Sequence, residues 1–360
     1  MSTTVTTPAV LRTGLVSWQW NLRLAFWLVV TAVATVLFMA LGITLGDYPL
    51  TLTEVLAVFA GGGTAIKQKV VLDLRLGRAI VGAAVGACLA FSGALTQTVA
   101  RNPLASPDIL GITNGASLAA VAALILGGAG AGGTLGVGAE AMVSSLGVPG
   151  TAVLGALLIA VLIWFIAGPV RGDMMSLVLI GVGCSILLSA LTTWLLAWAE
   201  LDRAAEARMW LTGSLNGRDL NHAWAPLVVA LLAIAAAGWL AFQLAALSLG
   251  ETTAHVLGHN VKITQVIQLL TAVVLAAVAV SAAGPIGFIA FVTPQIARRL
   301  AGTATPPLVL SAFCGAALLT GADLFTRTIA PWELPVGVVT AFFGAPVLLY
   351  LIISNNRKVR

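Results

Sequence analysis

The chain consists of long apolar runs separated by short polar connections. A helix that crosses a membrane needs about 20 apolar residues, because each residue rises ~1.5 Å and the hydrocarbon core is ~30 Å thick. Nine runs without a charged side chain are at least this long. They are Leu24–Gly46, Ala79–Ala100, Ile109–Ala139, Ala141–Val170, Met174–Ala199, Leu220–Gly250, Ile263–Ala297, Leu300–Ala322 and Leu334–Asn356.

The seventh run spans 35 residues, which is too long for one ordinary spanning helix. Gly284-Pro285 divides it, because proline lacks a backbone N–H and clashes with the preceding turn. The pattern therefore predicts ten transmembrane helices, the eighth short at about Gly287 to Leu300. The expected fold is an all-α integral membrane protein with one transmembrane domain over residues 24–356, between an N-terminal segment (1–23) and a tail (357–360).

Composition supports lipid as the main solvent of this chain. Hydrophobic residues make up 59% of it and charged residues only 9%, whereas soluble domains carry about 25% charged residues. The basic residues are scattered singly, so the net charge of +5 does not indicate a nucleic-acid surface. Cys88, Cys184 and Cys314 lie inside apolar runs without metal-ligand spacing, which is typical of small core residues.

An even number of spans places both termini on one side of the membrane. Lys and Arg outnumber Asp and Glu in the connections on that side, while the opposite side is slightly acidic. Because cytoplasmic loops carry the excess of basic residues, we expect both termini to be cytoplasmic in a multi-pass protein of the cell (inner) membrane. The first apolar run, Leu24–Gly46, exceeds the ~7–15 residues of a signal-peptide core, so we expect it to be retained as a span.

The spans are rich in small residues, which allow membrane helices to approach closely. Gly82-x3-Gly86 fits the small-xxx-small pattern, and we interpret it as packing within the chain rather than as a dimer motif. The glycine-rich stretch from Gly127 to Gly138 lacks the Gly-Lys-Ser/Thr of a phosphate loop. The sequence therefore predicts no nucleotide site, and no catalytic Ser/His/Asp group is evident either.

Glu251, His255 and His259 share one face of a short polar segment if it is helical, at spacing i, i+4, i+8. Histidines at i and i+4 are a known metal-ligand arrangement. Gly258 weakens a helix at this place and no fourth ligand is near, so we predict no metal site. A solvated amphipathic helix is the simpler interpretation.

Several motifs resemble the FecCD-type (BtuC-like) permease subunits of iron-siderophore and cobalamin ABC importers. The resemblance covers the chain from about Leu50, and its strongest stretches are LRLGR, RNPLASPDILGITNGAS, MWLTGSLNGRD, SLGETTAHVLG, GPIGFIAFVTPQIARRLAG and PWELPVGVVTAFFGAP. It implies a type II ABC importer permease fold that forms a translocation path by alternating access. It also implies that the chain binds no cofactor itself and is not an enzyme, since partner ATPases hydrolyse ATP-Mg.

One motif departs from the common family pattern. Many members have Val-Pro-His-Ile-Ala-Arg where this chain has Thr293-Pro294-Gln295-Ile296-Ala297-Arg298. The glutamine form and MWLTGSLNGRD resemble one half of a paired ferric-enterobactin-type permease. The resemblance therefore implies a ferric siderophore substrate and a heterodimer with a second, related permease.

Other functions stay open at this point. A cobalamin or haem importer permease of the same family is the first alternative. An ion-coupled secondary carrier is the next, although such carriers usually place a carboxylate at the membrane midplane and no span defined above contains one. A non-transporting membrane component is a further alternative.

The resemblance also assigns roles to particular segments. The inner segment at about 247–262 corresponds to the coupling helix that docks into the ATPase. The residues expected at that contact are Leu249, Gly250, Glu251, Leu257 and Gly258.

Two further groups follow from the resemblance. Asn102 and Leu104 lie in the turn beside the inner end of the path and are gate candidates. Arg75, Arg78 and Arg327 ring the outer mouth and are expected to dock the binding protein, since arginine pairs carboxylates bidentately; snorkelling to lipid headgroups is the alternative. The expected partners are a second permease, two ABC ATPase subunits, an extracytoplasmic substrate-binding protein, membrane lipid and the ferric siderophore, but no nucleic acid.

Overall fold

The computed structural model of the chain describes residues 10–13, 16–19, 21–46, 48, 50–108, 110–126, 137–166, 174–329 and 334–356. For residues 10–13, 16–19, 137–144, 174–178, 251, 351–352 and 354–356 it describes the backbone only. The predicted tail at 357–360 lies outside the described residues.

Helices make up the membrane domain. In chain order they are α1 (Leu22–Thr44), α2 (Leu52–Phe59), α3 (Ala65–Gln68), the π-helix η1 (Lys69–Leu76), α4 (Gly77–Val99), α5 (Ile112–Leu126), α6 (Val137–Ile166), α7 (Met174–Trp198), α8 (Leu201–Leu211), α9 (Leu220–Ser248), α10 (Glu251–Val256), α11 (Val261–Ala283), α12 (Ile289–Ala301), α13 (Leu308–Ile329) and α14 (Val336–Asn356).

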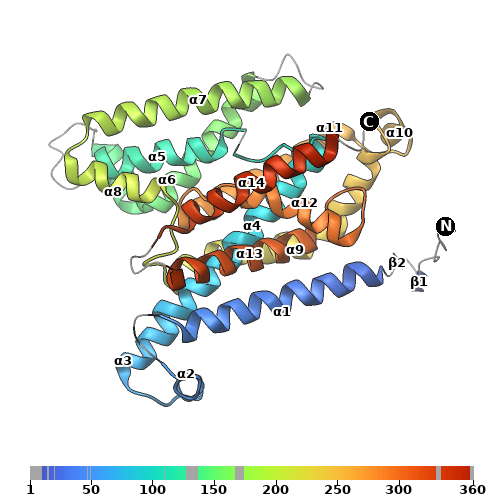
Figure 1. Ribbon diagram of the computed structural model, residues 1–360. Helices are drawn as coiled ribbons and strands as arrows, with labels where there is room; N and C mark the ends of the chain where they lie inside the picture. The colour runs from blue at the N-terminus through green and yellow to red at the C-terminus, as the bar shows by residue number, and fades with distance from the viewer. Residues whose placement is uncertain are drawn as a thin grey trace.

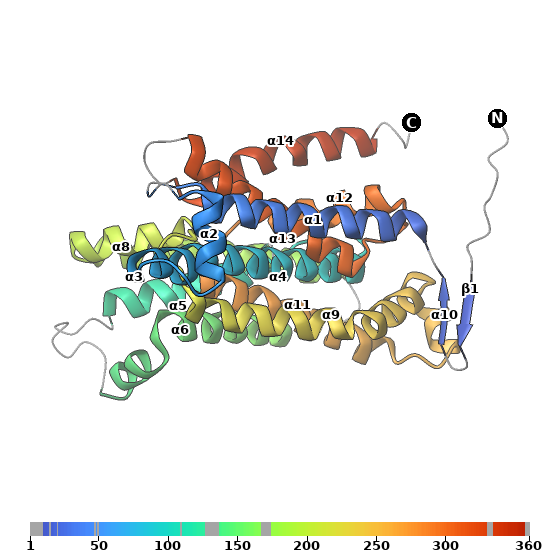
Figure 2. The same cartoon turned by 90° about the horizontal axis from the view of Figure 1, so that it is seen from below.

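The long helices run side by side in one bundle (Figure 1). α4 passes through the middle, α1 lies at one edge and α7 at the other, and α14 covers one face (Figures 1 and 2). We call the end that carries α10, the start of α1 and the end of α14 the α10 end, and the opposite end, with α2, α3 and α8, the α2 end (Figure 2). The first long helix thus begins, and the last one ends, at the same end of the bundle, as an even number of spans requires.

The all-α fold class is confirmed, and the expected spans correspond to observed helices. Seven helices among the described residues are long and apolar enough to cross a membrane. The shorter helices α5, α12 and α14 occupy the remaining three predicted positions. The break at Gly284-Pro285 is present, and the short eighth helix begins at Ile289 and ends at Ala301.

The structure departs from the predicted elements in several places. The polar N-terminal segment contains an antiparallel hairpin, in which strand β1 (Val10–Thr13) pairs with β2 (Val16–Gln19). α5 is described as Ile112–Leu126, and the last residues of its predicted run, from Val137, belong to α6; residues 127–136 lie outside the described residues. α6 is kinked at Gly147, whose φ of 64° is not helical.

Two predicted spans were also too short at the α2 end. The second span was expected from Ala79, but helical structure already begins at Ala65 and continues through η1 into α4. The ninth was expected to end at Ala322, but α13 continues to Ile329. Charged side chains ended the predicted spans, whereas in the structure these charges lie inside helices because they are paired, as described below.

α4 is held by glycine contacts on more than one side. Gly86 approaches Gly315 of α13 so closely that a Cβ on either would collide with the backbone oxygen of the other. A Cβ on Gly93 would collide with the backbone oxygen of Ala290 in α12. These contacts within one chain confirm the interpretation of the glycine pattern as intrachain packing.

Candidate coupling surface, gate turn and buried charge cluster

α10 is a separate six-residue helix between the long helices α9 and α11. Gly250 precedes it with φ 103° and Gly258 follows it with φ 84°, values that side-chain-bearing residues rarely adopt. These two glycines let the chain leave α9, form one short helix and turn back into α11. The short helix therefore stands at the α10 end as an exposed feature (Figure 2).

Apolar side chains project from this segment. Leu249 is 61% exposed, Val256 is 82% exposed and Leu257 is 59% exposed, whereas Ala254 is fully buried and anchors the helix. Apolar side chains clustered at a protein end that faces water mark an interaction site. The structure thus brings Leu249 and Leu257 of the predicted coupling contact together, with Gly250 and Gly258 shaping the turn; the Glu251 side chain is outside the described set.

Val256 is the member of this surface that sequence reasoning missed. Its apolar side chain, next to Leu257 in an otherwise polar segment, was the signal that could have revealed it.

The metal alternative gains no support at α10. His255 is exposed, and His259 is engaged elsewhere: its Nδ1 lies 3.0 Å from Oε1 of Gln243 and its ring lies against Phe242. Among the side chains that the structure describes, no group of three or more His, Cys, Asp or Glu is arranged to hold a metal ion.

The turn between α4 and α5 is tied to the coupling segment. Arg101 adopts φ 49°, and its Nη2 donates to the backbone oxygen of Leu247 at 2.8 Å, in the last turn of α9. Asn102 is half-buried, and its Oδ1 accepts a hydrogen bond from the Leu104 N–H at 2.9 Å, which closes an Asx turn. Leu104 is 40% exposed. Asn102 therefore shapes the turn and Leu104 projects from it, while Arg101, not singled out in the sequence, links the turn to α9.

A buried charge cluster joins α4 to α13 near the α2 end. Nε and Nη2 of Arg78 donate to Oδ1 of Asp323 at 3.0 and 2.8 Å, and Nη2 of Arg327 donates to Oδ2 at 2.8 Å. These three side chains are about one-tenth exposed or less. One carboxylate thus holds two guanidinium groups.

Arg75 completes this region from the preceding turn of helix. Its side chain is buried, and it donates to the backbone oxygens of Ile43 at 2.8 Å and Tyr48 at 2.6 Å. The last carbonyl groups of a helix lack partners within the helix, so Arg75 caps the end of α1. Arg327 contributes a further bond, from Nη1 to the oxygen of Gly42 at 3.2 Å.

The structure therefore brings Arg75, Arg78 and Arg327 together at one end, as the sequence predicts, but it turns their guanidinium groups inward. The sequence reasoning missed Asp323, which organises the cluster. The i, i+4 spacing of Asp323 and Arg327 at the end of an apolar run was the signal that could have revealed it.

Gln295, the residue that departs from the common family pattern, is buried between α12 and α4. Its Nε2 donates to Oε1 of Gln97, whose own Nε2 donates to the oxygen of Phe291 at 2.9 Å. The glutamine pair thus forms a closed hydrogen-bonded bridge between two helices. Gln295 is 3% exposed, so its role at this position is in helix packing.

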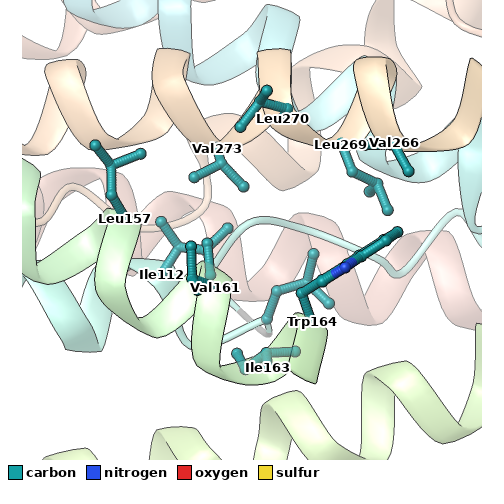
Figure 3. A pocket seen from close by; sticks show the side chains of 11 residues that line it. Ile112, Leu157, Val161, Ile163, Trp164, Val266, Leu269, Leu270 and Val273 are labelled. Atoms are coloured by element: carbon teal, nitrogen blue, oxygen red, sulfur yellow. The ribbon is translucent and has the colours of Figure 1, made fainter. Parts of the chain in front are cut away.

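A cavity of about 240 Å³ lies between α5, α6 and α11. Figure 3 shows Trp164 of α6 facing Val266 and Leu269 of α11 across it. Its lining side chains are apolar or aromatic. A polar solute would lose hydrogen bonds to water there without replacement, so this cavity is not a candidate path for such a solute.

The chain is similar to known membrane transport proteins. The model of the FecCD transport family matches residues 33–354. The ferric enterobactin transport system permease proteins FepG and FepD of Escherichia coli are 36% and 37% identical to it, over 88% and 89% of this chain and 92% of each relative. The cobalamin import system permease protein BtuC of Halobacterium salinarum is 37% identical, over 81% of this chain and 75% of its own length.

A solved structure of a metal-chelate type ABC transporter, in an inward-facing conformation, superposes with a TM-score of 0.75 at 26% identity. The match covers 93% of this chain and 98% of the solved one. Because the family model spans nearly all of the membrane domain and a solved relative shares its helical arrangement, the chain belongs to the FecCD transport family and has the fold of a type II ABC importer permease.

Proposed function

We propose that this chain is the transmembrane permease subunit of an ATP-driven importer of ferric siderophores, and that it forms the translocation path by alternating access. The observation that carries the proposal is the exposed apolar surface of α10, bounded by two positive-φ glycines and linked to the α4–α5 turn through Arg101. A surface of this kind is suited to receive motion from a partner and pass it to the membrane helices. The ferric enterobactin relatives support the siderophore class.

ATP-Mg acts on partner subunits in this proposal, and the chain itself hydrolyses nothing. When two ATPase subunits close, the groove that holds Leu249, Val256 and Leu257 moves. α10 transmits this displacement to α9 and α11, and the Arg101 bond to Leu247 carries it to the turn that contains Asn102 and Leu104. The gate at the inner end of the path then opens or closes with the ATPase cycle.

The orientation and partners follow from the same assignment. The α10 end, with both termini, faces the cytoplasm and the ATPases, and the α2 end receives the substrate-binding protein. A second, related permease completes the path, because FepG and FepD are both permease proteins of the ferric enterobactin transport system and both are similar to this chain. An isolated complex that contained this permease alone, in two copies, would contradict the heterodimer.

We also propose that the binding protein docks through Arg75, Arg78 and Arg327. The inward direction of these side chains adds a condition. A carboxylate of the binding protein has to displace Asp323 or the backbone oxygens that now accept from these arginines. The charge-reversing pair Arg75→Glu with Arg78→Glu should therefore lower docking affinity at low salt. Its thermal stability has to be measured in parallel, since the same groups hold α1, α4 and α13 together.

Cobalamin is the second candidate substrate, favoured by the cobalamin import relative. Gln295 does not separate the two candidates by direct contact, because it is buried in the bridge to Gln97.

The hydrogen bonds that Asp323 accepts argue against an ion-coupled carrier. A coupling carboxylate has to exchange a proton or ion, whereas Asp323 accepts three hydrogen bonds from two arginines.

The deciding experiment is uptake into proteoliposomes that contain this chain, its co-purified partners and a candidate binding protein. We expect uptake of a ferric siderophore only with ATP on the side of the α10 end and with binding protein on the other side. Parallel vesicles with cobalamin test the second candidate. Uptake that ignores ATP and follows a proton or sodium gradient would replace the importer by a secondary carrier, and absence of any co-purifying ATPase would favour a non-transporting component.

A further inference from the structure

The apolar cavity of Figure 3 has a size and a wall that suit hydrocarbon. It holds about 240 Å³, and the side chains that line it are aliphatic or aromatic. An apolar space of this kind offers water no hydrogen-bond partner, so it takes apolar molecules instead. The transport mechanism proposed above gives this cavity no task, and its occupant has to be sought in its surroundings.

The cavity opens toward the outside of the bundle. Val161 of α6 and Leu270 of α11 line it and are 52% and 55% exposed, whereas Ile112 of α5, in the same wall, is 2% exposed. Figure 2 shows α6 and α11 on the face of the bundle opposite α14. In a membrane-spanning chain, exposed apolar side chains within the helices face acyl chains rather than water. The open side of the cavity therefore faces lipid.

A positive charge lies one helical turn beyond the cavity, toward the α10 end. Lys262 is the second residue of α11. Val266 and Leu269 of the cavity wall follow it at i+4 and i+7, which is the spacing of one helix face. Lys262 is exposed, and within the described part of the chain no hydrogen bond or ion pair occupies its ammonium group. Its charge is therefore available to an anion at the mouth of the cavity.

Trp164 marks the same level on α6. It lies two residues before the end of α6, and it faces Val266 and Leu269 in the first turns of α11 (Figure 3). Tryptophan is enriched where hydrocarbon meets the headgroups, and lysine at this boundary extends its ammonium group toward water. The α11 part of the wall extends from Val266 to Val273, about 10 Å along the helix, or two-thirds of the ~15 Å depth of one leaflet. The cavity thus lies in the leaflet at the α10 end, with Lys262 at headgroup level.

We propose that this cavity binds one acyl chain of an anionic phospholipid, whose headgroup phosphate pairs with Lys262. The acyl chain supplies the dispersion contacts that the wall lacks on its open side. The Lys262 ammonium donates to the phosphate, and the positive end of the α11 dipole adds to the attraction. A choline headgroup brings its own cation, which competes with Lys262 for the phosphate. The site should therefore prefer a headgroup with a net negative charge.

Native mass spectrometry tests the headgroup preference on the full chain, purified in detergent and exchanged into an equimolar mixture of phosphatidylglycerol and phosphatidylcholine with matched acyl chains. A lysine near the membrane surface favours an anionic lipid by about fivefold, and we expect this ratio for the lipid that is retained at the highest collision energy. Lys262→Gln should lower the ratio to near one. The matched control is Lys69→Gln, which removes another exposed lysine at the α2 end and should keep the preference.

Ala160→Phe tests the cavity itself. Ala160 lines the cavity from α6, so the added ring fills the space and should remove the tightly held lipid, whichever headgroup it carries. Ala235→Phe is the matched control, because Ala235 is exposed on α9 and does not line the cavity. It should retain lipid as the wild type does.

A second measurement keeps the test open if Ala160→Phe fails to fold. Phospholipids with brominated acyl chains quench nearby tryptophans, and subtraction of the Trp164→Phe spectrum isolates the emission of Trp164. Trace brominated phosphatidylglycerol should quench this emission more than brominated phosphatidylcholine does, and Lys262→Gln should remove the difference.

Three results would overturn the proposal: equal retention of the two lipids by the wild type, an unchanged ratio in Lys262→Gln, or full lipid retention in Ala160→Phe. None of them depends on whether the complex transports a siderophore.

Discussion

Replacement of Asp323 should be far more damaging than replacement of either arginine that it binds. Asp323→Leu leaves Arg78 and Arg327 buried without their shared carboxylate, and breaking a buried pair in this way costs about 3–5 kcal/mol. Arg78→Met removes two charge-assisted bonds, but Asp323 keeps Arg327, so the cost should be nearer 1.5–3 kcal/mol. The triple variant Arg78→Met, Asp323→Leu, Arg327→Met removes all three of these charges and should recover most of the stability, because apolar replacements of buried ion pairs are often neutral.

Unfolding in mixed detergent and SDS micelles, followed by fluorescence of the 10 tryptophans, measures these differences as free energies of unfolding. A loss of 3–5 kcal/mol lowers the folding equilibrium constant by between about two and four powers of ten. The decisive comparison is the order of the variants' free energies of unfolding within one series. If Asp323→Leu is no less stable than Arg78→Met, or if the triple variant is as unstable as Asp323→Leu, the carboxylate does not organise the cluster and the reasoning is wrong.

Three further expectations concern other parts of the molecule. Gly93→Ala should lower the yield of folded protein sharply because its Cβ collides with the backbone of Ala290, whereas Gly183→Ala, which meets nothing within 4 Å, should leave folding unchanged. The Lys67 ammonium and the capping bonds of Thr51 lower the pKa of Glu54 to about 2. Its support for α2 is therefore complete only above the ordinary pKa near 4.5 and is lost progressively as the pH falls to about 2. Protection of α2 amides against hydrogen exchange should decrease as the pH is lowered through this range, and Glu54→Gln should show the reduced protection already above pH 5. Leu257→Asp should abolish retention of the ATPase in pull-downs without changing the melting temperature of the permease, and retention at the wild-type level would exclude this residue from the contact.

The sequence predicts the membrane domain well because apolar run length and the Gly284-Pro285 break are local properties. Both follow from the absence of water in the bilayer and from the missing N–H of proline. The same locality explains why the short polar segment after Leu249 is found as a separate helix between two long ones, with glycines at its borders. Span ends were predicted less well, since a charge inside a helix is tolerated only with a partner, and Asp323 lies 245 positions from Arg78.

The site residues also divide into those that local sequence reveals and those that depend on contacts between distant parts of the chain. Leu249 and Leu257 were found as members of a short segment, and the structure adds Val256, whose 82% exposure depends on how α10 rests on α9 and α11. The inward direction of Arg75 and the bond from Arg101 to Leu247 depend on backbone oxygens, which every residue has and which leave no trace in the sequence. The docking and gating roles themselves stay predictions until the assembled complex is tested.

The long separation between Arg78 and Asp323 has a consequence for biosynthesis. Spans enter the membrane in the order of translation, so α4 is inserted well before α13 exists. During that interval Arg78 lies in a helix at the membrane without the carboxylate that later neutralises it, and a charged residue in this position is costly. We therefore expect α4 to stay within the translocon or beside a membrane chaperone until α13 has been synthesised. Truncated chains that end before α13 should be degraded by quality-control proteases.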